Sequence, residues 1–206
     1  MRSAHEPNTA TQFALVASIL VGGYFLAFDA GEYLRNFTAA VYGRFWPVRN
    51  LMFLHVAAGG LALVAGAIQF GLAFLRRTST AHRWTGRVYV GAVFVSCIVS
   101  LAVISNGSAV GLVWTALLAI LAVAAMVYTA CGLIAARRRE WHRHATWMLR
   151  SYMAMMVFAW FRLGWEFPVL EELALRTRAA VILGLTMLIT FIATESILAL
   201  RARTTA

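Results

Sequence analysis

Six apolar stretches, each close to the length that crosses a bilayer, limit what this chain can fold into more than any other feature of its sequence. The hydrocarbon core of a membrane is ~30 Å thick, so a spanning helix needs about 20 consecutive apolar residues. Of the 206 residues, 62% are hydrophobic and only 13% are charged, and the mean hydropathy is +0.76. Soluble proteins carry about 25% charged residues. The chain is therefore predicted to be an all-α, polytopic integral membrane protein with the lipid bilayer as its surroundings.

The predicted architecture is one transmembrane domain over residues 1–206, with six helices of which the middle four form a central bundle. The spans are expected at about 13–28, 51–75, 86–105, 110–136, 145–167 and 179–200. Basic residues gather in the segments 76–87 and 137–150 and in the C-terminal tail, and short basic loops stay in the cytoplasm. We expect a multi-pass protein of the inner (plasma) membrane with both termini in the cytoplasm. Because the arginines flank apolar stretches, they do not predict binding to nucleic acid.

A short sequence pattern occurs twice at this predicted cytoplasmic boundary. It consists of an arginine run, then His-Arg, then Arg-x-Tyr: Arg76-Arg77, His82-Arg83 and Arg87-Val88-Tyr89 in the first copy, and Arg137-Arg138-Arg139, His142-Arg143 and Arg150-Ser151-Tyr152 in the second. Membrane topology and anionic lipid headgroups account for most of the arginines, and the tyrosines are expected to join Trp84 and Trp147 in an interfacial belt. Topology does not explain the repeated His-Arg step, for which two explanations stay open: coincidence in an arginine-rich chain, or a ligand site. Helix N-termini at His82 and His142 attract anions, so a phosphate, carboxylate or propionate group is an expected ligand.

The histidines suggest a cofactor, because a histidine beside a bilayer is costly and commonly has a function. In membrane b-type cytochromes, imidazoles from two helices ligate the haem iron and nearby arginines pair with the haem propionates. His82 and either His142 or His144 are the candidate ligands of a haem b, with His82 and His142 as the first choice for the iron. The candidate propionate partners are Arg83, Arg87, Arg143 and Arg150. Residues two apart on a helix point about 200° apart, so His142 and His144 cannot share one ion.

A fourth candidate cofactor-binding histidine, His55, lies near the outer end of the second predicted span and has no histidine opposite it. Arg162 and Glu166 are expected at a matching depth, so the three residues predict a second polar cluster at the outer face. At the inner face, Glu195 is expected to form an ion pair with Arg150 or Arg87.

The outer loop from Asp29 to Asn50 contains apolar residues at four-residue spacing, namely Tyr33, Phe37, Val41 and Phe45. This spacing predicts either a helix that lies in the membrane interface or an aromatic belt with irregular backbone. The two alternatives stay open at this point.

Several motifs together resemble a known family. They are His55-Val-Ala-Ala-Gly-Gly, Gly66-Ala-Ile-Gln69-Phe, His82-Arg-Trp-Thr-Gly86-Arg-Val-Tyr89, and His142-Arg143 followed by Trp147-Met148-Leu-Arg150-Ser151. Over roughly residues 50–165 the chain is similar to predicted bacterial membrane proteins grouped as domain of unknown function 2306. The resemblance implies a multi-helix protein of the bacterial inner membrane with His-Arg motifs at matching positions, and it implies no particular activity.

Two functions are predicted from these features. The first is a haem- or quinone-linked electron-transfer protein whose His/Arg site lies at the cytoplasmic face. The alternative is a transporter, sensor or assembly partner that binds an anionic small molecule or lipid at the same cluster. The sequence contains no nucleophile and base pair, phosphate-binding loop or metal-hydrolase motif, so a hydrolase is not expected and enzymatic activity is left open. The oligomeric state is not predicted.

Overall fold

Among the described residues, every regular secondary-structure element is a helix. A computed structural model describes residues 9–74, 80–106, 111–166 and 171–205. Arg76 and Arg77 of the first arginine run therefore lie outside the described residues. The elements are α1 (Thr9–Tyr24), η1 (Phe25–Ala30), α2 (Gly31–Arg35), α3 (Ala39–Tyr42), η2 (Gly43–Val48), α4 (Arg49–Phe74), α5 (Thr80–Ser105), α6 (Leu112–Arg137), α7 (Trp141–Trp165) and α8 (Leu175–Thr205).

The prediction of an all-α membrane protein is confirmed. Within the described residues, four helical segments are long and apolar enough to cross a membrane: Ala39–Ala73, Thr80–Ser105, Leu112–Arg137 and Leu175–Ala202. Two further long helices, α1 and α7, complete the six that the sequence predicted. Helix α1 has 16 residues, and α7 carries arginines and histidines along its 25 residues, which lowers its hydropathy.

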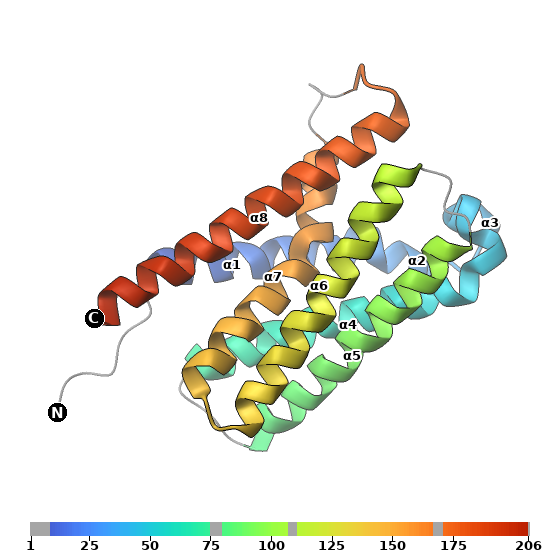
Figure 1. Cartoon of the computed structure of the whole chain (residues 1–206). Helices are drawn as coiled ribbons and strands as arrows, with labels where there is room; N and C mark the ends of the chain where they lie inside the picture. Colours follow the sequence, from blue (N-terminus) through green and yellow to red (C-terminus); the bar gives the residue numbers. More distant parts are fainter. Residues whose placement is uncertain (1–8, 75–79, 107–110, 167–170, 206) are drawn as a thin grey trace.

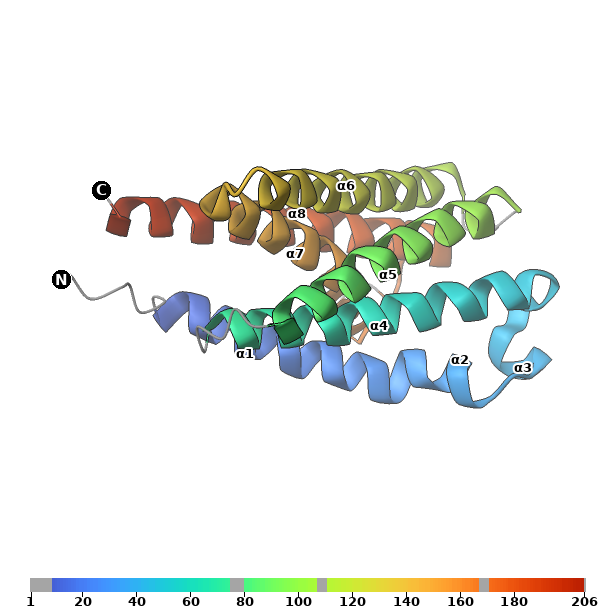
Figure 2. The same cartoon turned by 90° about the horizontal axis from the view of Figure 1, so that it is seen from below.

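Helices α4 to α7 form a central bundle in which α4 packs along α5 and α6 packs along α7 (Figures 1 and 2). Helix α8 covers α7 and α6, while α1 lies against α4 and α7. Successive long helices run in opposite directions. One end of the bundle, named the Arg-rich end, holds the start of α5, the connection Arg138–Glu140 and the end of α8. The other end, named the cavity end, holds η1 and the starts of α4, α6 and α8.

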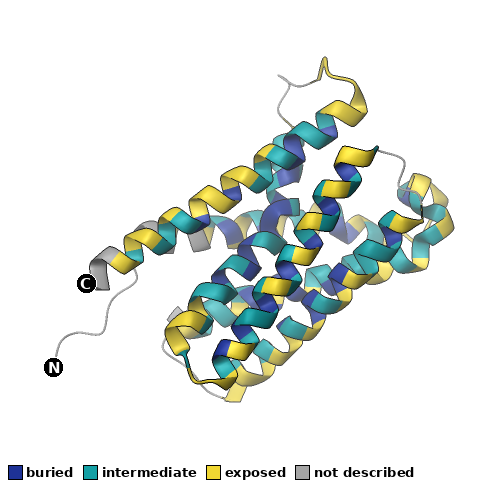
Figure 3. Ribbon diagram, in the orientation of Figure 1, coloured by how far each residue is buried: buried dark blue, intermediate teal, exposed yellow. Residues whose placement is uncertain are grey.

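Large apolar side chains remain exposed on the outward faces of the helices, as a surrounding bilayer requires (Figure 3). Helix α8 shows this most fully, with Leu185, Leu188, Ile189, Phe191 and Ile192 all exposed. The inward faces instead bury two apolar clusters, in which alanines and aromatic rings pack with a few larger aliphatic side chains.

The two tyrosines of the repeated Arg-x-Tyr pattern lie in the bundle core, and their predicted place in an interfacial belt is wrong. Tyr89 and Tyr152 are each only 1% exposed, whereas Trp84 is 60% exposed. Gly66 on α4 makes this burial possible, because a Cβ at that position would overlap the Tyr152 ring and press on Tyr89. The tyrosines are therefore packing residues that hold α4, α5 and α7 together.

A chain of hydroxyl groups crosses the same region. Thr129 Oγ1 donates to the carbonyl of Ala125 at 2.7 Å, so its single proton is used there. Ser151 Oγ, 2.7 Å from Thr129 Oγ1, must then be the donor to Thr129, and Tyr89 OH, 2.7 Å from Ser151 Oγ, must donate to Ser151. All three side chains are buried. The direction of each hydrogen bond in this row of hydroxyl groups thus follows from its final acceptor, the Ala125 carbonyl.

The outer loop does not form one interfacial helix. It is broken into α2, α3 and η2, and Thr38 begins α3 by accepting a hydrogen bond from the Val41 amide. Its aromatic rings contact each other instead. Tyr42 contacts Tyr33, Phe37 and Trp46, and Phe37 also contacts Trp46 and Phe53. Neither alternative describes this backbone as predicted, because it is helical on both sides of a break at residues 36–38.

Candidate functional site

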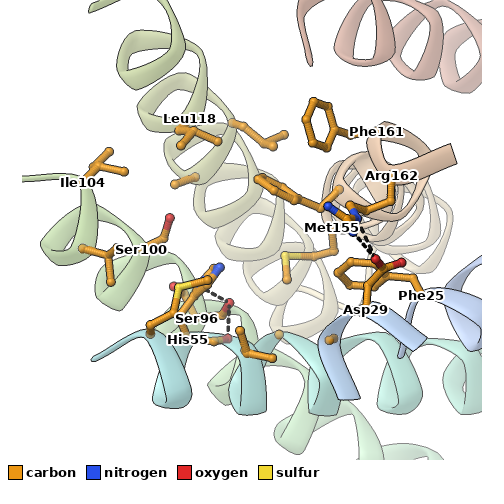
Figure 4. Close-up of a pocket in the computed structure, with 18 of the residues that line it drawn as sticks. Phe25, Asp29, His55, Ser96, Ser100, Ile104, Leu118, Met155, Phe161 and Arg162 are labelled. Atoms are coloured by element: carbon orange, nitrogen blue, oxygen red, sulfur yellow. Dashed lines mark hydrogen bonds and ion pairs between the residues drawn. The ribbon is translucent and has the colours of Figure 1, made fainter. Parts of the chain in front are cut away.

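A cavity of about 390 Å³ opens at the cavity end, between η1 and helices α4 to α8 (Figure 4). This volume lies within the roughly 300–1,000 Å³ typical of small-molecule sites. Most of the wall is apolar, with aromatic rings from Phe25, Trp114, Phe158, Phe161 and Trp165. The polar lining residues include Asp29, Arg44, His55, Ser96, Ser100 and Arg162. The cavity therefore combines space for a flat apolar ring with a few hydrogen-bonding groups.

The imidazole of His55 is held in one orientation by α5. Its Nδ1 lies 3.0 Å from the carbonyl oxygen of Ser96, and because a carbonyl only accepts, Nδ1 carries the proton in the neutral ring. The Ser96 hydroxyl lies 3.2 Å from the His55 carbonyl and donates to it. Gly59, one turn further along α4, allows this approach, since a Cβ there would lie 3.2 Å from Ser96 Oγ. His55 Nε2 is left as an unprotonated acceptor with no hydrogen-bond partner among the described residues.

On another wall of the cavity, Arg162 of α7 binds Asp29 (Figure 4). Arg162 Nε donates to Asp29 Oδ1 at 2.7 Å, and a second guanidinium nitrogen donates to the same oxygen. Asp29 belongs to η1, a single turn of π-helix, and such turns are rare and frequent at functional sites. The wider turn contributes Phe25, Asp29 and Ala30 to the cavity lining. Because the Arg162 side chain is 43% exposed, the pair remains accessible and its contribution to stability is small.

The predicted outer cluster is correct in two of its three members. His55 and Arg162 line the same cavity, but Glu166 is exposed at the C-terminal cap of α7 and does not line it. The acidic partner of Arg162 is Asp29, which lies 133 positions earlier in the sequence and was not predicted. The available signal was a lone aspartate at the end of the first apolar stretch, where a charged group needs a partner.

The predicted histidine site at the Arg-rich end is only partly assembled by the fold. His144 Nδ1 donates to the Gly132 carbonyl of α6 at 2.8 Å, which leaves its Nε2 as an acceptor. His82 Nδ1 is buried without a hydrogen-bond partner in the described structure, while the His82 carbonyl accepts from Gln69 Nε2. His142 is exposed, and its carbonyl accepts from Thr146. Of the two alternatives on α7, His144 is thus the histidine that is held in place.

The predicted arginines of this end are mostly engaged elsewhere. Arg150 forms a two-point ion pair with Glu195, at 2.6 and 2.8 Å, so the expected pairing of Glu195 with Arg150 is confirmed. The Arg150 guanidinium also stacks on Trp147, and that of Arg87 stacks on Trp84. The remaining two make local contacts: Arg143 with Glu140 and Arg83 with Thr80. Nowhere in the described ranges do three His, Cys, Asp or Glu side chains form a group that could hold a metal ion.

A known protein family matches most of the chain. Residues 52–198 match the family model described as "Predicted membrane protein (DUF2306)". The chain belongs to this family. The match includes His55, Ser96 and Arg162, whereas Asp29 and the π-helical turn precede it. No curated protein and no solved structure is significantly similar to the chain. The resemblance stated from the motifs is therefore correct, and the family leaves the activity to be argued from the site.

Proposed function

We propose that this chain is a membrane protein that binds a quinone-type molecule in the cavity at its outer end. The observation that carries the proposal is the position of His55, whose Nε2 is an unpaired acceptor on the wall of an apolar, aromatic-lined cavity. A ring with oxygen substituents suits such a site, because its faces contact aromatic side chains while its oxygens reach polar groups. The prediction of a quinone-linked protein is retained, but its site moves from the Arg-rich end to the cavity end.

The Arg-rich end is less suited to binding a quinone than the cavity end. Arg150 is paired with Glu195, and His142 is exposed. The cavity end, in contrast, brings residues of α4, α5 and α7 and of η1 around one partly open cavity. Anionic lipid headgroups at Arg83 and Arg143 remain the simplest partners of the Arg-rich end.

In the proposed orientation the Arg-rich end and both chain termini face the cytoplasm of the bacterial inner membrane. The support is the arginine distribution, because short loops rich in arginine are retained inside. The cavity would then open toward the outer leaflet.

The test of quinone binding uses the purified full-length protein in lipid nanodiscs and decylubiquinone as the probe. Trp114 and Trp165 line the cavity, so bound quinone is expected to quench tryptophan fluorescence in a saturable way. Ser100→Phe fills the cavity from α5 and should weaken binding by tenfold or more. The matched control is Ile98→Phe on the same helix, because Ile98 is 56% exposed and does not line the cavity.

Saturable quenching that Ser100→Phe removes and Ile98→Phe retains would support the proposal. Quenching that does not saturate, or that survives Ser100→Phe in a folded protein, would contradict it. Circular dichroism and gel filtration of both variants establish that the folds are comparable.

A haem b at the Arg-rich end is the second candidate function. One observation favours it: His144 Nδ1 is tied to the Gly132 carbonyl, the arrangement that commonly orients a ligating imidazole. The chain prepared from haem-supplemented cells should then show a Soret band that sharpens on reduction with dithionite. His144→Ala should remove the band and His142→Ala should not. A colourless preparation would exclude this candidate without affecting the cavity proposal.

A further inference from the structure

On two walls of the cavity, at His55 and at Asp29, the hydrogen bonds show which protons are already in use. His55 Nδ1–H is used by the Ser96 carbonyl, and the Ser96 hydroxyl proton is directed at the His55 carbonyl. On this wall no polar hydrogen of either side chain is left for a ligand. What remains is the lone pair of His55 Nε2, so the wall accepts a hydrogen bond and does not donate one.

The Asp29 wall also offers an acceptor. Both hydrogen bonds from Arg162 reach Oδ1 of Asp29, and Oδ2 has no hydrogen-bond partner among the described residues. Arg162 gives the Asp29 carboxylate a guanidinium partner inside a largely apolar wall. The cavity thus presents an unpaired acceptor on each of two walls, from α4 and from η1.

A ligand that satisfies both walls must carry hydrogen-bond donors at its ring. We propose that the cavity binds the reduced, two-hydroxyl form of a quinone in preference to the oxidised form. This inference rests on the proposed function and specifies its ligand. A hydroquinone donates one O–H to His55 Nε2 and has a second O–H for the Asp29 carboxylate. An oxidised quinone has only acceptor oxygens, so its carbonyl would face the Nε2 lone pair without a proton between them.

Covering an acceptor with a ligand that cannot donate to it is costly, and a difference of about 1.4 kcal/mol corresponds to a tenfold change in affinity. The quinol form of decylubiquinone should therefore bind at least about tenfold more tightly than the quinone form, measured anaerobically in nanodiscs. Calorimetric titration is suited to this comparison because the two forms differ in how they quench fluorescence. A dimethoxy analogue of the same ring cannot donate and cannot be oxidised to a quinone without losing its methyl groups. It should bind as weakly as the quinone, which separates donor capacity from redox chemistry.

The decisive variant is His55→Phe, which retains an aromatic ring and removes the acceptor. Its affinity for the quinol should fall to that for the quinone, so the preference disappears. Leu54→Phe is the matched control, because Leu54 is the neighbouring residue, is 45% exposed and does not line the cavity. If His55→Phe does not fold, His55→Gln replaces it, since the glutamine amide can donate and should reverse the preference.

The outcomes separate the two proposals. Equal binding of both forms, or tighter binding of the quinone, overturns the inference about the reduced form and leaves quinone binding intact. No binding of any form removes the proposed function itself. A quinol preference that persists in folded His55→Phe overturns the assignment of His55 as the acceptor.

Discussion

At the scale of single residues, the structure separates the two halves of the repeated Arg-x-Tyr pattern. The arginines reach ring faces and carboxylates near the helix ends, whereas Tyr89 and Tyr152 are buried between helices. The pairing of Arg150 with Glu195 was predictable, because both lie about equally far from one membrane face. The pairing of Arg162 with Asp29 was not, because it depends on a π-helical turn and on how α1 packs against α7.

The row of hydroxyl groups predicts how much the Tyr89 hydroxyl contributes to stability. Tyr89→Phe removes the donor to Ser151 and should lower the free energy of unfolding by about 1 kcal/mol, the usual net value of such a hydrogen bond. Unfolding in detergent micelles, followed by circular dichroism against added denaturing detergent, measures the change. Tyr152→Phe is the control, since no hydrogen bond of the Tyr152 hydroxyl is present in the described structure, and it should have little effect. Equal losses in the two variants would contradict a stabilising hydrogen bond between Tyr89 and Ser151.

At the scale of elements, small residues determine where helices approach each other. Two glycines follow His55 in the motif His-Val-Ala-Ala-Gly-Gly, and the structure uses the first, Gly59, to bring α4 against Ser96 of α5. The outer loop shows the limit of periodicity, because its four-residue spacing continues across Asn36–Thr38, where the helix is interrupted. Periodicity records which residues are apolar, but ring contacts between short turns produce the same spacing without a continuous helix.

A pair of glycine substitutions in α4 tests this packing. Gly66→Ala places a methyl group into the ring of Tyr152 and should destabilise the protein by about 1–3 kcal/mol. Gly71→Ala should be neutral or stabilising by up to about 1 kcal/mol, because no atom lies within 4 Å of the added carbon and alanine favours the helix. The thermal midpoint of aggregation in matched detergent compares the two. A neutral Gly66→Ala would show that the tyrosines can repack.

At the scale of the whole molecule, the hydropathy and the positions of the charged residues were sufficient to predict six long helices that alternate in direction. Each long helix overlaps one predicted apolar stretch, although α5 begins six residues before its stretch and α8 ends five residues after its own. The cavity could not be predicted in the same way. It depends on eight elements contributing residues from distant parts of the chain, and no local pattern records how their ends converge.

The orientation in the membrane is tested by cysteine labelling in intact bacterial cells. In a variant with Cys97 and Cys131 replaced by alanine, Thr38→Cys at the cavity end should react with a membrane-impermeant maleimide. Arg138→Cys at the Arg-rich end should react only after the cells are permeabilised, because the arginine-rich loops are expected inside. Both positions are exposed in the structure. The reverse pattern would show that the cavity opens toward the cytoplasm.

The hydroxyl chain at the bundle centre also bears on proton leakage through the membrane. Proton transfer along hydroxyl groups requires each to accept a proton on one side while releasing one on the other. Here the chain ends on the amide carbonyl of Ala125, which is far too weak a base to hold a proton. Tyr89, Ser151 and Thr129 therefore form a row of hydroxyls that is closed to proton flow, and a helix bundle with buried hydroxyls in its core can still insulate.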